Sequence, residues 1–426
     1  MPTNTVHSGQ TRRYDGLTLV ADGDGYILGS RHSADFLAVP EIGGLVIQWL
    51  QSGAGESECT ARAGELAGEP VDVAGFLADL ESAGLLPGPL AGTDAGTDAG
   101  TGPETGTGVH AAAGADRPPR GHRVGKVLFG RIGLLVQGSL AALGVLILIT
   151  RPELRPTFTD AIVTGVPLAS ILIMTVIGIC GGLLHELAHL LAAAAKGVPS
   201  SLSLGRRLYT LVYQTDLTRL WSLPRRDRLL PLSAGMIIDA ALLGALLGLL
   251  AGPLRTADPL LVDVVRAAAF IKFGGLIFQA EVFMRTDVYA ILVAVSGCRN
   301  LWATKGAVAR RAIGRAGAAD LDHLDGVSGT EIRWARAYLA LYLPGVVGAT
   351  WYLVTFALPA LGQIVAMSVA AVVDNGPLTL IGAAGVLATV LAVVPTGLVL
   401  LNAVRSGLRV MAGVLRRGPE PLATNP

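Results

Sequence analysis

Long apolar runs dominate the chain after residue 128. About six of them reach the roughly 20 residues that a helix needs to cross a bilayer; they cover residues 129–150, 160–195, 229–252, 260–298, 337–360 and 378–402. The second and fourth are too long for one straight crossing, because a 39-residue helix would extend about 58 Å against a hydrocarbon core of about 30 Å. The pattern predicts an α-helical polytopic membrane protein in which these two runs tilt, break or leave the bilayer.

The first 89 residues follow a different pattern. Short apolar stretches at 17–20 and 26–28 flank an Asp-Gly-Asp-Gly turn, which predicts a β-hairpin. Apolar residues at helical spacing follow at 42–50 and 71–80. We therefore expect a small α+β domain over residues 1–89.

The remaining divisions follow from composition. Residues 90–122 open with the repeat AGTDAGTDAGTG, which cannot build a core and predicts a flexible linker. Residues 123–417 form the expected membrane domain, and residues 418–426 a short tail. The stretch 361–373 is apolar enough to hold a re-entrant piece.

Overall composition agrees with a membrane protein, since 51% of the 426 residues are hydrophobic and 15% are charged. The connections 196–228 and 299–336 each hold seven Lys or Arg, whereas 151–159, 253–259 and 361–377 hold three together. Six spans place every basic connection on one side. Because basic loops stay in the cytosol, we expect both termini of this cell-membrane protein to be cytosolic.

Several classes of protein are disfavoured. Residues 1–40 are polar and contain no signal-peptide pattern. Cys59, Cys180 and Cys298 are scattered and indicate neither a disulfide framework nor a thiolate zinc site. Residues 1–90 contain four Arg and twelve Asp or Glu, a net charge of −8 that would repel phosphates, so we expect no nucleic-acid partner.

The second apolar run carries His185-Glu186-Leu187-Ala188-His189, an H-E-x-x-H motif. Residues i and i+4 of a helix share one face, so both imidazoles would point the same way and hold one Zn²⁺. Glu186 would hold and deprotonate a water molecule at the metal. Such polar side chains are costly in an apolar run, so the motif predicts a metal site in a membrane segment rather than a chance match.

A hydrolytic zinc site takes three protein ligands and keeps one open position. The other five histidines lie outside the apolar runs: His7, His32, His110, His122 and His323. A carboxylate is therefore the better candidate. The fourth run has a polar interruption, QAEVFMRTDVY at 279–289, where a helix can unwind around a site. We expect Asp287 to be the third ligand, with Glu281 as the alternative; both could instead form an internal ion cluster with Arg285.

These residues resemble those of the site-2 protease family of intramembrane zinc metalloproteases, over about residues 125–300. In that family an H-E-x-x-H helix is joined by an Asp from a later N-P-x-D-G-like segment. The resemblance implies that His185, His189 and Asp287 bind zinc and that Glu186 is the catalytic base. The His₂–carboxylate set also favours zinc over other metals.

The second motif departs from the family pattern. Gln279 stands about where the family has Asn, Val288 stands where it has Gly, and the proline is missing. The T-D-V-Y form and the following Cys-Arg-Asn-Leu at 298–301 are more similar to the peptide zinc metalloproteases found with peptide-maturation systems. These departures concern substrate positioning more than metal binding.

The N-terminal domain resembles the PqqD-like family, the peptide-recognition domain of ribosomal-peptide pathways. The matching stretches are the opening strands, FLAVPEIGGLVIQWLQSG at 36–53 and VDVAGFLADLESAGLL at 71–86. The resemblance implies a small winged-helix-like fold that binds a leader peptide as an added strand. The alternative is an unrelated small α+β regulatory domain.

Two further features bear on the site. Residues 201–221 alternate in part and predict either a hairpin that offers an edge to an extended substrate or an amphipathic connector. We expect Asp239, inside the third run, and Gln279 to contact either a metal ligand or the substrate. The alternative for Asp239 is an ion pair with Lys272.

Taken together, these features predict a membrane zinc endopeptidase that hydrolyses a peptide bond in a peptide precursor or a membrane protein, in peptide maturation or export. One alternative is a regulatory intramembrane protease that releases a membrane-anchored signalling protein. The other is a non-catalytic zinc-bearing component of peptide export or immunity. The intact Glu186 favours an enzyme, because a structural zinc site has no use for a base at that position.

Overall fold

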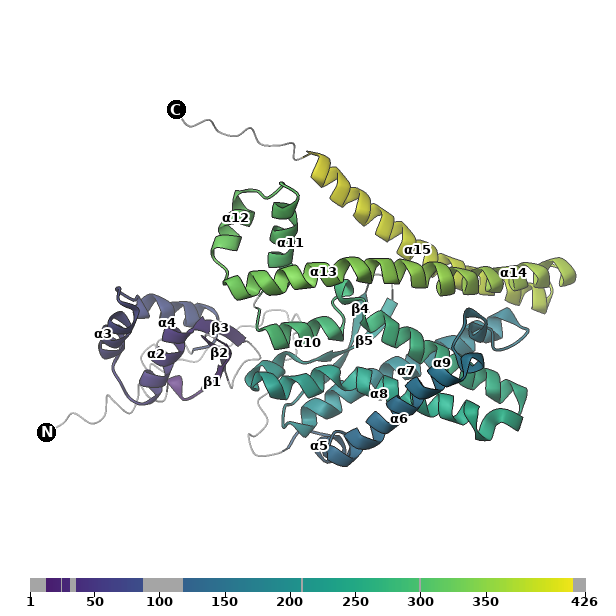
Figure 1. Ribbon diagram of the computed structural model, residues 1–426, viewed down its shortest axis with the longest axis horizontal. Coiled ribbons are helices and arrows are strands. Elements are labelled where there is room, and N and C mark those ends of the chain that lie inside the picture. Colours follow the sequence, from purple (N-terminus) through teal and green to yellow (C-terminus); the bar gives the residue numbers. More distant parts are fainter. Residues whose placement is uncertain are drawn as a thin grey trace, which may run out of the picture. The chain divides into compact units, whose positions relative to one another are not determined.

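The computed structural model describes residues 13–23, 25–30, 36–86, 118–207, 210–298 and 300–416. Most of the expected linker, residues 90–117, and the tail at 418–426 lie outside the described residues. The chain divides into two compact units (Figure 1). Unit 1 contains residues 1–122, 196–200 and 216–228, and unit 2 contains residues 123–195, 201–215 and 229–426.

Unit 1 contains a three-stranded antiparallel sheet in the order β1-β2-β3. Its strands are β1 (Leu17–Ala21), β2 (Gly25–Ser30) and β3 (Phe36–Pro40). Leu19 pairs with Leu28, which pairs in turn with Leu37. The predicted hairpin is confirmed. Strand β3 was not predicted; it and β1 are the two edge strands of this sheet among the described residues.

Three helices complete this unit: α2 (Glu41–Gln51), α3 (Glu56–Ala67) and α4 (Val73–Ser82). Helix α2 packs against β2 and β3, and α3 packs against α2 and α4. The predicted helices at 42–50 and 71–80 are confirmed, and Asp72 caps α4 by accepting from the N–H of Gly75 at 2.8 Å. Helix α3 escaped prediction because it buries only Cys59 and Ala63 on an otherwise polar surface. Leu28, Ile47 and Leu80 form the centre of the core.

Unit 2 is built from helices and one β-hairpin. The helices are α5 (His122–Leu128), α6 (Arg131–Thr150), α7 (Pro167–Ala195), α8 (Arg225–Ala251), α9 (Pro259–Gln279), α10 (Asp287–Ser296), α11 (Leu301–Ala312), α12 (Ala318–Asp325), α13 (Gly329–Tyr352), α14 (Leu358–Asn375) and α15 (Leu380–Arg416). The hairpin consists of β4 (Ser201–Arg207) and β5 (Thr210–Asp216), which confirms the hairpin interpretation for residues 201–216. The end of the predicted stretch forms a 3-10 helix instead, Thr218–Ser222. Helix α8 starts in unit 1 and continues into unit 2.

Five helical segments within the described residues are long and apolar enough to cross a membrane. They are α6, α7, α8, the run Gly329–Asn375 and the first part of α15. The protein is therefore a mostly helical membrane protein. The run 260–298 is not among the five, because α9 contains three charged residues and the helix is interrupted between Gln279 and Asp287.

Two other segments differ from the expected spans. Residues 361–373 continue the helical run as α14 instead of connecting two spans, and α14 lies alongside α15 (Figure 1). The second run becomes helical only at Pro167, after a 3-10 turn at Phe158–Ala161. Both differences arise because hydropathy measures how apolar a segment is, whereas backbone hydrogen bonding sets where a helix begins and ends.

Close backbone contacts hold the helices around the site. Gly144 of α6 faces Gly244 of α8, where an added Cβ would meet backbone atoms of the opposite helix. Gly125 of α5 makes the same kind of contact with the carbonyl of Leu191 in α7. Small residues let membrane helices approach closely enough for backbone packing. These contacts pack α6 against α8 and α5 against α7, the two helices that carry most of the candidate site.

Candidate metal centre

Helix α7 presents both histidines of the H-E-x-x-H motif on one face. The His185 and His189 rings lie 4.9 Å apart, edge to face. The His189 side chain is buried, at 3% exposure, and His185 is 12% exposed. One helical turn between the two residues brings their Nε2 atoms to 3.2 Å, as the spacing predicts.

Asp287 joins them from the interruption between α9 and α10. Its Oδ2 atom lies 2.9 Å from Nε2 of His185 and 3.1 Å from Nε2 of His189. The three residues are the one group of metal-binding type among the described residues, with donor atoms all within 4.8 Å of one another. Glu281 is not part of that group, and no ion pair joins Asp287 to Arg285 in the described parts of the chain.

The interruption holds Asp287 through its own hydrogen bonds. The Asp287 N–H donates to Oε1 of Gln279 at 3.0 Å, and the Thr286 hydroxyl donates to the Gln279 carbonyl at 2.8 Å. Arg285 takes a left-handed backbone conformation, with φ of 57°. The buried Tyr338 hydroxyl donates to the carbonyl of Val282 at 3.1 Å. Gln279 thus closes the loop that carries the carboxylate, although the sequence alone did not indicate how.

The other ring nitrogens determine which tautomer each histidine adopts. Nδ1 of His189 lies 2.7 Å from the carbonyl oxygen of Pro231, which can only accept. Nδ1 of His185 lies 2.8 Å from Oδ2 of Asp239. Both Nδ1 atoms therefore carry a proton, and in the neutral rings both Nε2 atoms point bare lone pairs at each other and at the Asp287 carboxylate.

Asp239 has both of the partners that the sequence suggested. One carboxylate oxygen accepts from His185, and the other forms an ion pair with Lys272. Lys272 also donates to the carbonyl of Gly181 at 2.9 Å. Asp239, Lys272 and Gly181 are all buried. The ion pair orients the Asp239 carboxylate, which in turn orients the His185 ring.

Gly235 of α8 leaves space in front of the histidines. A Cβ atom at this position would lie less than 3.0 Å from Nε2 of both His185 and His189. No side chain can occupy that position without displacing the rings. The signal in the sequence was an ordinary glycine in an apolar helix, so its importance could not be recognised there.

The donor set fits a zinc ion. The three donor atoms lie 2.9–3.2 Å from one another, so a single cation could contact all three in place of a proton on Nε2. Two imidazole nitrogens and one carboxylate oxygen are the ligands of a hydrolytic zinc site, which leaves one position open. His185, His189 and Asp287 are thus the residues that would hold the ion.

Glu186 lies next to the ligands and is held from the hairpin. The N–H of Thr215 in β5 donates to Oε2 of Glu186 at 2.9 Å, and the Thr215 hydroxyl donates to the Glu186 carbonyl at 3.0 Å. Thr215 is buried at 8% exposure. The hairpin was expected beside the site, but its direct contact with Glu186 was not, because a threonine in a strand carries no such signal.

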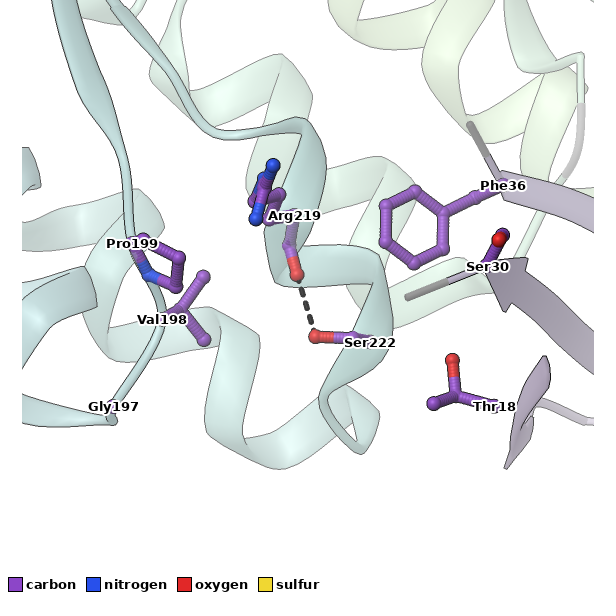
Figure 2. A pocket seen from close by; sticks show the side chains of 8 residues that line it. All are labelled: Thr18, Ser30, Phe36, Gly197, Val198, Pro199, Arg219 and Ser222. Carbon is purple, nitrogen blue, oxygen red and sulfur yellow. Dashed lines mark hydrogen bonds between the residues drawn. The ribbon is translucent and has the colours of Figure 1, made fainter. Parts of the chain in front are cut away.

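Unit 1 contains a separate open pocket between its sheet and the connection that follows α7 (Figure 2). The sheet contributes Thr18, Ser30 and Phe36, and the connection contributes Gly197, Val198, Pro199, Arg219 and Ser222. Figure 2 shows the Phe36 ring on the side of the sheet that faces the connection, where Ser222 donates to the Arg219 carbonyl at 2.7 Å.

Comparisons with protein-family models, curated proteins and solved structures found no match for this chain.

Proposed function

We propose that this protein is a membrane-embedded zinc endopeptidase. The observation that supports the proposal most strongly is the convergence of the Nε2 atoms of His185 and His189 with the Asp287 carboxylate. Glu186 lies on the same helix as the two histidines. The resemblance to site-2 proteases, more specifically to the peptide zinc metalloproteases, supports the same activity. The substrate is a peptide precursor or membrane protein, and the process is peptide maturation or export.

A bound Zn²⁺ would act as a Lewis acid that activates water and polarises the scissile carbonyl. His185, His189 and Asp287 hold the ion, and Asp239 and Pro231 keep the two imidazoles in the tautomer that ligation needs. Glu186 accepts a proton from the attacking water and returns it to the leaving amine nitrogen. Thr215 keeps the Glu186 carboxylate oriented for that exchange.

Two free strand edges suit an extended substrate. The hairpin β4–β5 has two strands, so β5 has an edge unpaired within the hairpin close to Glu186. An extended peptide would add to such an edge through main-chain hydrogen bonds, which exposes its carbonyls as a helical peptide would not. In the PqqD-like reading of unit 1, the free edge of β3 binds a leader peptide in the same way.

The proposed location is the cell membrane, with both termini in the cytosol. Basic residues concentrate in the connections 196–228 and 299–336, which the positive-inside rule assigns to the cytosol. Both unit 1 and the connection that carries the hairpin would then meet a peptide made in the cytosol.

The test measures zinc content and peptide cleavage in the detergent-purified protein. The wild type should contain about one zinc ion per chain. Asp287→Ala should lose most of it, whereas Glu281→Ala, which alters the other carboxylate of the interruption, should keep it. Absence of bound metal from the wild type would overturn the proposal.

Glu186→Gln separates an enzyme from a structural zinc site. The variant should retain zinc but cleave a fluorogenic peptide library at least about 100-fold more slowly than wild type, the usual contribution of a general base. If Glu186→Gln cleaved the library as fast as wild type, Glu186 could not be the general base.

A further inference from the structure

The connection between α7 and α8 contributes to both units. Residues 196–200 and 216–228 belong to unit 1, whereas the hairpin residues 201–215 belong to unit 2. The chain therefore passes from one unit to the other between Thr215 and Asp216. Residues 216–228 are continuous with the hairpin at Thr215–Asp216 and with the rest of α8 at Arg228–Leu229. A change in their packing therefore reaches Thr215, the residue that holds Glu186, through its direct neighbour Asp216.

On the unit 1 side the connection is fastened by a buried arginine. Arg228 is 1% exposed and the largest fully buried side chain within the described residues. Its Nε donates to the Leu223 carbonyl at 2.7 Å and its Nη2 to the Trp221 carbonyl at 3.2 Å. Its guanidinium also lies 4.6 Å from the centre of the Trp221 ring.

The carboxylate that balances this charge is Asp22 of the N-terminal sheet. Asp22 Oδ2 lies 3.4 Å from Nη1 of Arg228, and Oδ1 accepts from Nε of Arg225. No other carboxylate pairs with Arg228 in the part of the chain that the structure describes. A buried cation is tolerated only when it is paired, so the position of residues 216–228 depends on Asp22.

The β1–β2 turn is shaped to receive these arginines. The Asp22 N–H donates to the Gly25 carbonyl at 2.8 Å, which closes the turn. Gly23 has φ of 68°, and a Cβ atom there would overlap the Arg225 guanidinium. The turn therefore needs glycine both for its backbone and for the approach of Arg225. The same connection lines the pocket with Thr18, Ser30 and Phe36 (Figure 2).

On the unit 2 side the connection reaches the catalytic carboxylate directly. Thr215 makes two hydrogen bonds to Glu186, and its neighbour Asp216 starts the chain of contacts back to Arg228. The Asp216 carboxylate accepts from the Thr218 hydroxyl at 2.6 Å and from the Thr218 N–H at 3.0 Å. These bonds hold the pKa of Asp216 below its usual range, so the carboxylate stays charged and the turn stays closed.

We infer that Asp22 is a positioning residue for Glu186, acting through Arg228 and the connection. Without the Asp22 charge, Arg228 would be buried unpaired, and the segment 216–228 would relieve this cost by moving towards water. That movement would withdraw Thr215 from Glu186. The inference deepens the proposed function, on which the role of Glu186 rests: the domain proposed to bind a peptide also orients the base that cleaves it.

The test follows amide hydrogen exchange in the full-length protein, loaded with zinc in detergent. In Asp22→Asn the amide of Thr215 should exchange at least about tenfold faster than in wild type, because a charge-assisted contact no longer opposes local opening. Asp15→Asn makes the same chemical change at an exposed residue of unit 1 and should leave this exchange unchanged. Asp22→Glu, which keeps the charge, should retain most of the protection.

Two further measurements make the result decisive. Amides of α2 and α4 should remain protected in Asp22→Asn, which shows that the domain is folded. Arg228→Leu leaves the sheet unaltered but removes the guanidinium that fastens the connection, with its bonds to the Leu223 and Trp221 carbonyls, and it should also accelerate exchange at Thr215. Unchanged exchange at Thr215 in Arg228→Leu, or in a folded Asp22→Asn, would overturn the inference.

The hydrogen-exchange measurement needs neither substrate nor turnover. Its result is therefore independent of the zinc and cleavage experiments, so the inference about Asp22 and the proposed function can be refuted separately.

Discussion

Single residues at the candidate metal centre divide into those that would bind an ion and those that orient these ligands. His185, His189 and Asp287 converge, while Asp239 and Pro231 hold the far side of each imidazole. The second group is as important as the first, because an imidazole that is free to rotate binds a metal less tightly. The sequence pointed to His185, His189 and Asp287 because their side chains are of the types that bind zinc. For Asp239 it offered two partners, a metal ligand or Lys272, and the structure shows both contacts.

Gly235 offers a sharp test at this level. Gly235→Ala should abolish or strongly reduce zinc binding, since its Cβ would overlap Nε2 of both histidines. The control is Gly182→Ala. Gly182 lies on the same helix as the histidines, and a Cβ added there would meet no atom within 4 Å, so this variant should bind zinc as wild type does. Zinc content of the two purified variants decides the matter; equal zinc in both would show that the space in front of the rings is not used.

Asp239 gives a graded prediction. Asp239→Asn should weaken zinc affinity by about 10–100-fold, because His185 loses the carboxylate that fixes its tautomer. Affinity is measured by competition with a chelator, and Asp263→Asn, an exposed carboxylate on α9, is the matched control. An affinity equal to wild type in Asp239→Asn would mean that its pairing with Lys272 is its whole role.

Among the elements, the break between α9 and α10 is the one that creates the site. An unbroken helix over residues 260–298 would satisfy its own backbone, but it could not turn Asp287 towards α7. Gln279 and Thr286 satisfy the groups that the break exposes, and Tyr338 does the same for Val282. The break was predictable from sequence because its polar residues stand out in an apolar run, and the structure confirms it. The hydrogen bonds within the break could not be predicted from the sequence.

The core of unit 1 contains a tyrosine, Tyr14, whose ionisation should lower the stability of this unit at alkaline pH. Tyr14 is buried and donates to Glu56 at 3.0 Å. Burial first, and the Glu56 carboxylate second, raise the pKa of Tyr14 from 10.0 to about 12. The folded unit keeps this proton where the unfolded chain loses it. The stabilisation is therefore complete below pH 10 and is lost as pH rises through about 12.

Tyr14→Phe should remove this dependence. Thiol labelling of the buried Cys59 reports the opening of unit 1, in a protein whose other two cysteines are replaced by serine. The ratio of labelling rates, wild type to Tyr14→Phe, should rise between pH 10 and 12. A ratio that stays constant over that range would contradict the role given to Tyr14.

For the whole molecule, five candidate spans lie within a mostly helical protein that also has a small sheet-containing unit. The sequence indicated about six spans. The difference concerns α9 and α10, which together replace one expected crossing, and α14, which extends another. The sidedness of the connections stays a prediction, because it depends on where the membrane lies.

Cysteine labelling from either side of the membrane tests that sidedness. In a variant without native cysteines, new cysteines at Arg226 and Asp325 should react with a membrane-impermeant reagent only from the cytosolic side. A cysteine at Thr256, in a connection poor in basic residues, should react only from the opposite side. Labelling of all three from one side would exclude the proposed topology.

Some of this protein follows from local sequence alone, and some does not. Apolar runs, the N-terminal hairpin and the spacing of His185 and His189 are local properties, since each depends on residues within a few turns of one another. The contacts of Asp287, Asp239, Gly235 and Thr215 join residues 29 to 102 positions apart or lie on different helices. Only folding brings such residues together, because packing and hydrogen bonding between elements select one arrangement that no local pattern encodes. The pairing of Asp22 with Arg228 across 206 positions is the longest instance of this dependence that we describe.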